Sequence, residues 1–343
     1  MKPTIYDVAK EAGVSIATVS KVLNRVGRIS DETIKRVERV MKELQYQPSV
    51  VASALTGKQT YTIGMLLPDL ANPYFAEVAR HVEDRANQLG YSVIICSTDN
   101  NVEKESNYIS LLNQKSVDGL IIATGIQHEQ TSQHIMKQQI PVALFARDFP
   151  SLVVDAVLLD DFLGGYQATK HLIDLGHERI AMIAENEEYL SAQERIRGYC
   201  QAMEDAGLSE YTRRKTVYSF TIEGAKQNVI QLLDSLDPPT AIFTTNDILA
   251  IGAIQAAYEC RISIPDELSI VGFDDTILSR IVTPPLTSVR QPIQEMGIQV
   301  MDLLVQEIEQ KKRGRRKIVL LPELIIRKST GKPTRRSRAI KEG

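Results

Sequence analysis

Residues 15–24 combine small, apolar and polar side chains in an order that suits contacts with DNA. The segment reads S-I-A-T-V-S-K-V-L-N. If Ser15 caps a helix, Val19, Val22 and Leu23 fall on its buried side. The opposite side, called the reading face below, then carries Ile16, Ala17, Thr18, Ser20, Lys21 and Asn24. Small apolar groups contact thymine methyls, and hydroxyl and ammonium groups bind base edges and phosphates. We therefore expect the reading face to bind DNA.

A preceding helix is needed to hold the reading helix. Ile5, Val8 and Ala9 recur at helical spacing, and Gly13 permits a sharp turn before Ser15. This order predicts a helix-turn-helix. The alternative is an ordinary pair of packed helices at the start of an α/β protein.

A third helical pattern begins at Ser30 or Asp31, either of which could cap it. Its apolar positions are Ile34, Val37, Val40, Met41 and Leu44. We expect Tyr46 and Pro48 to end this helix, because the residue before a proline disfavours helical geometry.

The run I-Y-D-V-A-K-E-A-G-V-S-I-A-T-V-S-K-V-L-N resembles the start of the lactose/galactose-repressor (LacI/GalR) family of bacterial transcription regulators. The resemblance implies that residues 1–47 form a DNA-binding headpiece, with Tyr6 among its DNA contacts, and that residues 48–60 form a hinge helix and linker. Leu55 matches the leucine that enters a minor-groove step of the operator. Ser49 stands where the family usually has an asparagine that contacts DNA. The alternative is a plain linker whose leucine packs on the larger domain.

From residue 61 onward, apolar runs alternate with helical patterns. The predicted strands read T-I-G-M-L-L-P, Y-S-V-I-I-C-S-T, G-L-I-I-A, P-V-A-L-F, D-A-V-L-L, R-I-A-M-I-A, T-V-Y-S-F, T-A-I-F-T, L-S-I-V-G-F, I-V-L-L-P and E-L-I-I-R. The predicted helices are Pro73–Leu89, Glu103–Asn113, Phe162–Leu175, Leu190–Ala206, Glu223–Leu236, Ile248–Glu259 and Pro292–Gln310. Uniformly apolar strands indicate parallel sheets that are covered on both faces. The alternation of strands and helices occurs in two successive series, which predict two Rossmann-like lobes over residues 61–330.

The resemblance implies the same fold class, an all-α helix-turn-helix headpiece plus a two-lobed α/β core like that of type I periplasmic binding proteins. This core would also carry the dimer contacts. Residues 331–343 form a basic tail that we expect to be disordered. It lacks a leucine heptad, so a dimer rather than a tetramer is expected.

Charge is distributed unevenly along the chain. Residues 1–58 hold ten basic and six acidic side chains, and residues 311–343 hold thirteen and two. The stretch between them holds 17 basic and 35 acidic side chains, so the whole chain carries only −3. An acidic body disfavours DNA lying across it, which leaves the headpiece to meet the phosphates.

Polar and aromatic side chains follow the predicted strands, where ligands of open α/β sheets bind. They are Asn72, Tyr74, Phe75, Arg147, Arg195, Phe220, Asn246, Asp274 and Gln291. The resemblance implies that each of them binds an effector. Aromatic rings stack on sugars or flat bases, and polar groups bind their edges. Asparagine and aspartate after a strand are also common as turn residues or caps, and Phe220 or Tyr74 could lie in a core.

Ala146 departs from the family pattern, because many sugar-binding members place an aspartate before the arginine at this point. Without that acceptor, a phosphorylated or otherwise anionic effector paired by Arg147 and Arg195 becomes a hypothesis beside a free sugar.

The sequence contains none of the glycine-rich phosphate loops or nucleophile elbows of common enzymes, so we expect no enzyme activity and no cofactor. His171 and His177 have poor spacing for a metal site, and none is expected. Cys96, Cys200 and Cys260 are far apart, which suggests a reducing compartment. The N-terminus lacks the apolar core of a signal peptide, so a cytoplasmic location is expected.

These observations predict a homodimeric transcription regulator on a near-palindromic double-stranded operator, controlled by a small polar effector such as a sugar or sugar phosphate. One alternative keeps the DNA binding but assigns control to a phosphocarrier protein on the first lobe. A solute-binding protein is disfavoured by the headpiece. The runs A-L-T-G-K, V-D-G-L-I-I-A-T-G-I and K-I-V-L-L-P-E-L resemble the degradation-activator regulators of Gram-positive bacteria.

Overall fold

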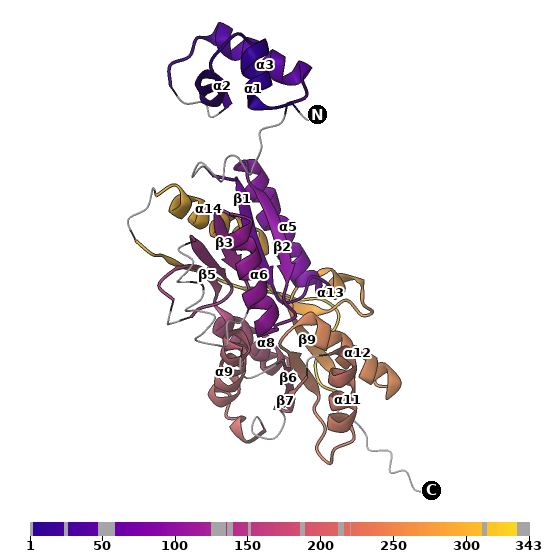
Figure 1. The fold of residues 1–343 in the computed structure, drawn as a ribbon. Coiled ribbons are helices and arrows are strands. Elements are labelled where there is room, and N and C mark those ends of the chain that lie inside the picture. Colours follow the sequence, from indigo (N-terminus) through magenta and orange to yellow (C-terminus); the bar gives the residue numbers. More distant parts are fainter. Residues whose placement is uncertain are drawn as a thin grey trace. The chain divides into compact units, whose positions relative to one another are not determined.

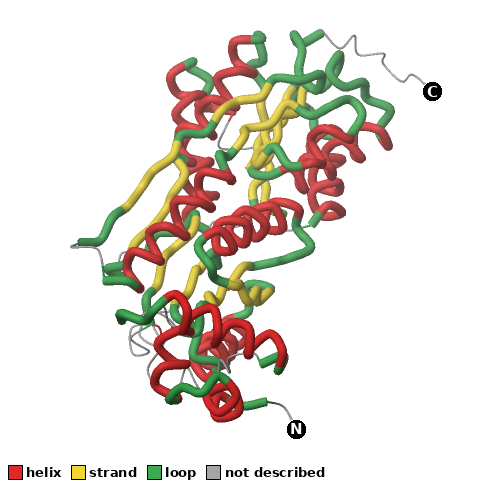
Figure 2. Tube along the Cα trace, turned by 90° about the horizontal axis from the view of Figure 1, so that it is seen from above, coloured by secondary structure: helices red, strands yellow, loops and turns green. Residues whose placement is uncertain are grey.

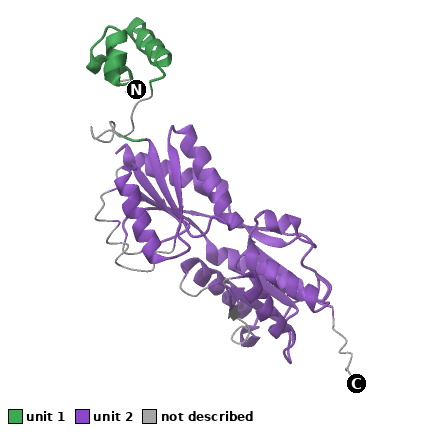
Figure 3. Ribbon diagram, turned by 45° about the vertical axis from the view of Figure 1, so that its right-hand side comes forward, with its two compact units in different colours: residues 1–60 green, residues 61–343 purple. Residues whose placement is uncertain are grey.

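The chain forms two compact units, Met1–Thr60 and Tyr61–Gly343, which are called the headpiece unit and the body unit below (Figure 3). The computed structural model describes residues 3–23, 27–46, 59–124, 135, 140–149, 152–185, 189–211, 216–219, 221–310 and 314–334. Among these residues, every helix is too short or too polar to span a bilayer.

Three short helices make up the described part of the headpiece unit. They are α1 (Ile5–Glu11), α2 (Ile16–Leu23) and α3 (Asp31–Glu43) (Figure 1). Their shared core consists of Val8, Ala9, Ala12, Val19, Val22, Val37 and Val40. The predicted helix-turn-helix and its buried positions are therefore confirmed.

Local hydrogen bonds explain where these helices begin. Gly13 has a φ of +62°, a conformation that glycine adopts without strain, and it turns the chain between α1 and α2. The Ser15 hydroxyl then accepts a hydrogen bond from the Thr18 amide at 3.1 Å. Ser30 caps α3 by accepting from the Thr33 amide at 3.3 Å. Ser15 and Ser30 thus satisfy amides that a helix start leaves free.

The end of α3 differs from the prediction. The helix stops at Glu43, and Gln45 takes a left-handed conformation with a φ of +51°. The Tyr46 amide then donates to the Met41 carbonyl at 2.9 Å. This turn satisfies carbonyls in the last turn of α3 and ends at Tyr46, two residues before Pro48. Pro48 itself lies outside the described residues.

The body unit contains two six-stranded sheets, which define its N-lobe and C-lobe. The N-lobe sheet has the strand order β11-β5-β4-β3-β1-β2, and its neighbouring strands are all parallel. Its strands are β1 (Thr62–Leu67), β2 (Ser92–Ser97), β3 (Gly119–Ile122), β4 (Val142–Phe145), β5 (Asp155–Leu159) and β11 (Lys317–Leu320).

The C-lobe sheet has the order β12-β10-β9-β8-β6-β7, and only its edge pair β10–β12 is antiparallel. Its strands are β6 (Ile180–Ala184), β7 (Thr216–Tyr218), β8 (Ala241–Thr244), β9 (Ser269–Asp274), β10 (Thr287–Arg290) and β12 (Glu323–Ile325). The predicted two-lobed α/β core is therefore confirmed.

Helices cover both faces of each sheet, as the apolar strands require (Figure 2). In the N-lobe, α5 (Pro73–Gln88) and α14 (Ile293–Ile308) cover one face, and α6 (Val102–Gln114) covers the other. In the C-lobe, α8 (Asp161–Asp174) and α9 (Leu190–Asp205) cover one face, and α11 (Ile222–Leu233) and α12 (Asp247–Glu259) cover the other. All seven begin and end within three residues of the predicted bounds.

The chain passes between the two sheets at three places. The first passage joins β5 to α8, the second joins β10 to α14, and the third joins β11 to β12. The first two place Asp161 and Gln291 between the lobes. The predicted strands I-V-L-L-P and E-L-I-I-R correspond to β11 and β12, which lie in different sheets.

Two features of the body unit were not predicted. The strand β2 lies at a sheet edge and is not buried throughout, since Ile94 is 38 % and Ile95 37 % exposed. The sequence analysis also missed β10 and the short helix α13 (Ile277–Ile281). The strand β10 reads T-S-V-R. Its buried Ser288 hydroxyl donates a hydrogen bond to Asp247 at 2.7 Å. Apolar patterning does not reveal a tertiary contact of this kind.

Buried His177 ties the end of the described chain to the C-lobe. Its ring nitrogens lie 2.9 Å from the Thr240 hydroxyl and 2.9 Å from the Gly331 carbonyl. Burial lowers the pKa of His177 below its usual 6.5. The unfolded chain therefore binds this proton more readily than the folded chain, and the free energy of unfolding decreases as the pH falls below about 6.5.

We expect His177→Asn to weaken this pH dependence while lowering stability at neutral pH. The measurement is the melting temperature of the full chain at pH 7.5, 6.5 and 5.5. His81→Asn, a histidine substitution in the N-lobe, serves as the control. An unchanged pH dependence in His177→Asn would contradict the assignment of the stability loss at low pH to His177.

Candidate functional site

The reading face of α2 is accessible in the headpiece unit. Ile16 is 40 % exposed, Ala17 and Lys21 are also exposed, and Thr18 and Ser20 are half-buried. On α1, Tyr6 is 68 % exposed. Val19 and Val22, on the opposite side of α2, are buried in the core. The described residues of the predicted reading face are thus exposed or half-buried, and its role in DNA binding stays a prediction.

Local hydrogen bonds fix the conformation of the first residues of the reading face. The hydroxyls of Ser15 and Thr18 lie 2.9 Å apart, so one donates to the other. The Ser15 oxygen also accepts the Thr18 amide, so these two side chains hold the first turn of α2. The predicted contacts Asn24, Ser49 and Leu55, and Phe220 of the predicted effector site, lie outside the described residues.

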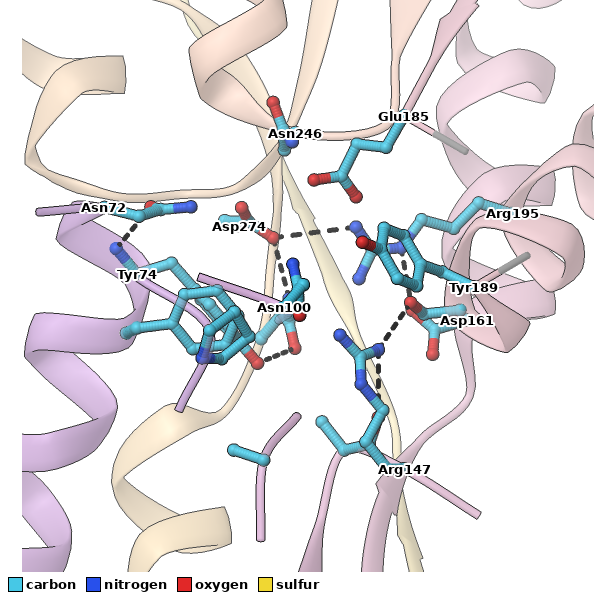
Figure 4. Close-up of a pocket in the computed structure, with 16 residues that line it drawn as sticks. Asn72, Tyr74, Asn100, Arg147, Asp161, Glu185, Tyr189, Arg195, Asn246 and Asp274 are labelled. Atoms are coloured by element: carbon cyan, nitrogen blue, oxygen red, sulfur yellow. Dashed lines mark hydrogen bonds and ion pairs between the residues drawn. The ribbon is translucent and has the colours of Figure 1, made fainter. Parts of the chain in front are cut away.

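A cavity between the two lobes of the body unit gathers all the other predicted effector-site residues (Figure 4). They are Asn72, Tyr74, Phe75, Arg147, Arg195, Asn246, Asp274 and Gln291. The cavity has about 590 Å³ of empty volume, including the part open to solvent.

Arg195 forms the centre of a buried ion network at this cavity. Its Nε lies 2.8 Å from an Asp161 oxygen, and its Nη1 lies 3.7 Å from an Asp274 oxygen. Nη1 also donates to the Thr245 carbonyl, and the guanidinium lies 3.6 Å from the centre of the Phe273 ring. The side chains of Arg195, Asp161 and Asp274 are only 8 %, 11 % and 7 % exposed. One cation thus compensates two buried carboxylates.

A hydrogen-bonded chain connects the N-lobe to this network. The Tyr74 hydroxyl donates to Gln291 Oε1 at 3.0 Å, and Gln291 Nε2 donates to Asp274 Oδ1 at 2.7 Å. Tyr74 lies in α5 of the N-lobe, and Gln291 lies in the passage between β10 and α14. The chain orients the Asp274 carboxylate and joins the two lobes at the floor of the cavity.

Burial dominates the protonation of these groups. It raises the pKa of Asp274 well above its usual value, and the nearby Arg195 charge opposes this rise. Burial also raises the pKa of Asp161, again against Arg195. The pKa of Tyr74 is raised by burial too, so its phenol stays protonated and can donate to Gln291.

Arg147 reaches across the cavity from the N-lobe. Its Nη1 donates to the Ser191 hydroxyl of α9 at 2.8 Å, which is a second link between the lobes. Its guanidinium lies 5.7 Å from the centre of the Tyr189 ring. Its Nε is buried and has no hydrogen-bond partner. An unsatisfied buried donor is costly, so this N–H is available to an acceptor on a bound molecule.

The two predicted asparagines also cap helices. Asn72 Oδ1 accepts the Tyr74 amide at 3.0 Å at the start of α5, and Asn246 Oδ1 accepts the Leu249 amide at 2.8 Å at the start of α12. The capping alternative therefore holds for both residues. Both still line the cavity, and capping fixes the orientation of each amide group.

Sequence reasoning missed several residues that line the cavity: Asn100, Asp161, Glu185, Tyr189 and Ser191. Asp161 and Glu185 follow β5 and β6 almost directly. The rule that ligands bind beyond the carboxyl ends of strands would have found both. Tyr189 and Ser191 lie at the start of α9 and carry no such signal.

Two residues of the cavity have left-handed backbones. Asp274 has a φ of +99° and Ala146 has a φ of +51°. Residues with a Cβ adopt this region at a cost of about 1–2 kcal/mol. Strained residues of this kind cluster at functional sites. Aspartate and asparagine tolerate the left-handed region better than alanine. The backbone at position 146 would therefore suit an aspartate better than the alanine that is present.

Comparisons with known proteins agree with both units. Residues 4–49 match the family of bacterial regulatory proteins called the lacI family, and residues 169–330 match a periplasmic binding protein-like domain. The chain is 48 % identical to the HTH-type transcriptional regulator DegA of Bacillus subtilis over 333 residues, which is 96 % of this chain and 98 % of that protein.

Solved structures show the same fold. A lac repressor dimer bound to operator and the anti-inducer ONPF is similar with a TM-score of 0.85 and 29 % identity, covering 96 % of this chain and 100 % of that chain. A complex of the transcriptional regulator CelR with cellobiose is similar with a TM-score of 0.74 and 28 % identity, covering 95 % of this chain and 99 % of that chain.

We expect Arg195→Met to destabilise the protein strongly, because it leaves Asp161 and Asp274 buried without their cation. Breaking a buried ion pair in this way costs about 3–5 kcal/mol. Arg197→Met is the matched control, since Arg197 lies two residues along α9, is 65 % exposed and pairs with Glu194 at 2.6 Å. Exposed pairs of that kind contribute about 1 kcal/mol or less.

Urea unfolding of the full chain measures both effects, followed by the fluorescence of a dye that binds exposed apolar surface. Equal losses in Arg195→Met and Arg197→Met would show that the buried network does not stabilise the C-lobe.

Proposed function

This chain belongs to the lacI family of bacterial regulatory proteins and is a DNA-binding transcriptional regulator; on that premise we propose that it acts as a homodimer on a near-palindromic operator. We further propose that a small polar molecule in the cavity between the lobes sets its affinity for that operator. The observation that carries the second proposal is the convergence of the predicted residues on one cavity within the body unit.

The chemistry of the reading face supports the DNA contacts. Ile16 and Ala17 are exposed and lack long hydrogen-bonding groups, so they would select bases by apolar contact with thymine methyls. Lys21 would bind a phosphate or a guanine, and Ser15 and Thr18 would hold the DNA backbone. Residues 1–58 carry a net positive charge, as phosphate binding requires.

Exposed apolar side chains support the homodimer. Ile222, Tyr258, Ile277 and Ile281 are called the C-lobe apolar patch here, and they are 37 %, 86 %, 55 % and 66 % exposed. They lie on α11, α12 and α13, and α12 packs against both of the other helices. Contiguous exposed apolar surface of this kind marks interaction sites, and two copies of one helix-turn-helix match the two half-sites of a palindrome.

The lining of the cavity supports a polar effector. Tyr74 and Phe75 offer aromatic faces, and their ring centres lie 4.9 Å apart. Carboxylate, guanidinium and amide groups also line the cavity. This mixture of hydrogen-bond donors and acceptors suits a polar ring with several hydrogen-bonding edges.

Control by a phosphocarrier protein on the N-lobe is the alternative. It predicts that operator affinity responds to that protein and not to metabolites, whereas an effector cavity predicts the reverse. A solute-binding role without DNA remains disfavoured, because it leaves the reading face without a use.

We expect a random-sequence duplex library to yield a near-palindromic site when it is selected with the full chain. Lys21→Gln should weaken binding to selected and random duplexes alike and reduce the salt dependence by about one counterion. Ile16→Ala should instead weaken only the selected site, by about tenfold, because it removes base contacts.

Fluorescence anisotropy over a range of salt concentrations measures both effects. Lys35→Gln in α3 is the control for charge loss, since Lys35 is exposed but lies outside the reading face. Equal binding of the wild-type chain to palindromic and random duplexes would rule out sequence-specific regulation by this face.

We expect the double variant Tyr258→Asp, Ile281→Asp to dissociate the dimer, because it would bury unpaired charges in the proposed interface. Sedimentation equilibrium should show the wild-type chain as a dimer and the variant as a monomer at micromolar concentration. Val153→Asp is the control, as Val153 is 77 % exposed and lies outside the C-lobe apolar patch. A variant that stays dimeric would place the interface elsewhere.

A further inference from the structure

We propose that the effector carries a cationic nitrogen that binds at Glu185 and an oxygen acceptor that binds at Arg147, as in an amino sugar or an amino acid. This inference rests on the proposed role of the cavity as the effector site and specifies the chemistry of its ligand. It departs from the anionic effector that the sequence alone suggested.

Negative side chains outnumber positive ones around the cavity. Its lining contains the carboxylates Asp161, Glu185 and Asp274 and the guanidinium groups Arg147 and Arg195. If all five groups are ionised, the lining carries one excess negative charge, and if Asp274 is protonated, as its raised pKa favours, the lining is neutral. In neither case does a phosphate placed here find an excess of positive charge to balance it.

Arg195 is not free to pair with an anionic ligand. It already contacts Asp161 at 2.8 Å and Asp274 at 3.7 Å, and it donates to the Thr245 carbonyl. Drawing its charge toward a phosphate would leave two buried carboxylates less compensated. The sequence suggested Arg195 as half of an anion clamp, and these contacts argue against that role.

Glu185 is the third carboxylate of the lining, and its charge acts on Arg195, which already compensates Asp161 and Asp274. It directly follows β6, and its backbone amide donates to the Thr245 hydroxyl at 3.1 Å, which fixes where its side chain starts. Its carboxylate makes no hydrogen bond or ion pair with any residue that the structure describes. Figure 4 shows this carboxylate on the side of the cavity that also holds Asn246 and Asp274.

Arg147 supplies the complementary end. It forms no ion pair with any described carboxylate, and its buried Nε lacks an acceptor. Its Nη1 is held by Ser191 at 2.8 Å. In Figure 4 the Arg195 guanidinium lies between Glu185 and Arg147, which enter the view from different sides. A molecule with an amine at one end and an oxygen acceptor at the other would satisfy both.

The physical preference follows from desolvation. When a neutral molecule fills the cavity, it removes water from Glu185 and leaves that carboxylate only a share of the Arg195 charge, which is costly in a closed site. An ammonium group removes the same water and supplies the counter-charge. The amine-bearing member of a matched pair should therefore bind more tightly than its hydroxyl analogue.

The test is competition within a mixture of matched compounds. The full chain is equilibrated with equal concentrations of glucose, glucosamine and glucose 6-phosphate, of galactose, galactosamine and galactose 6-phosphate, and of lactate, alanine and phosphoserine. Gel filtration separates the protein, and mass spectrometry quantifies what it retains. We expect amine-bearing members without phosphate to be retained at least tenfold more than their hydroxyl-bearing or phosphorylated counterparts.

Two variants assign the preference to its residue. Glu185→Gln should abolish the tenfold preference. Glu178→Gln is the matched control, because Glu178 is exposed and precedes β6 instead of following it. Retention of the preference in Glu185→Gln would overturn the assignment.

The outcomes separate this inference from the proposed function. Stronger retention of neutral or phosphorylated members, lost in Asp274→Asn, would overturn the cationic ligand and keep the cavity as an effector site. Retention of no compound, together with an operator affinity that no member of the mixture changes, would count against both.

Discussion

The body unit depends on the compensation of two buried carboxylates by one guanidinium group. Asp161 begins α8, Arg195 lies in α9 and Asp274 ends β9, so the network holds three elements of the C-lobe together at the rim of the cavity. Burial favours the neutral form of both acids, and Arg195 is the charge that opposes it. The positions of α8 and α9 at the cavity are therefore constrained by electrostatics as well as by packing.

Apolar patterning predicted most of the fold because most of its strands are buried on both faces. Strands such as β1 and β8 read as uninterrupted apolar runs, and a parallel sheet covered by helices is the arrangement that buries them. The pattern failed where polar contacts replace apolar ones. The strand β10 is buried through hydroxyls that bond distant residues, and α13 is five residues long. Neither leaves a periodic signal.

The location of the site could be predicted, but its charge balance could not. The strand-end rule brought Asn72, Asn246 and Asp274 to one cavity, because parallel strands end at the same edge of a sheet. The partners of Arg195 are 34 residues before it and 79 residues after it, so no local pattern shows that its charge is already used. The same limit hid Glu185, whose significance comes from the partners it lacks.

Two hydrogen bonds join the lobes at the cavity, from Tyr74 to Gln291 and from Arg147 to Ser191. A ligand bound to Arg147 shares that guanidinium with Ser191, so it changes the balance between open and closed lobes only by the difference between the bonds it makes and any it replaces. A single hydrogen bond contributes about 0.5–1.5 kcal/mol. Exchanging one or two of them therefore covers the roughly 1–3 kcal/mol that allosteric coupling usually involves. The proposed control of operator affinity therefore needs no larger rearrangement within the body unit than this exchange.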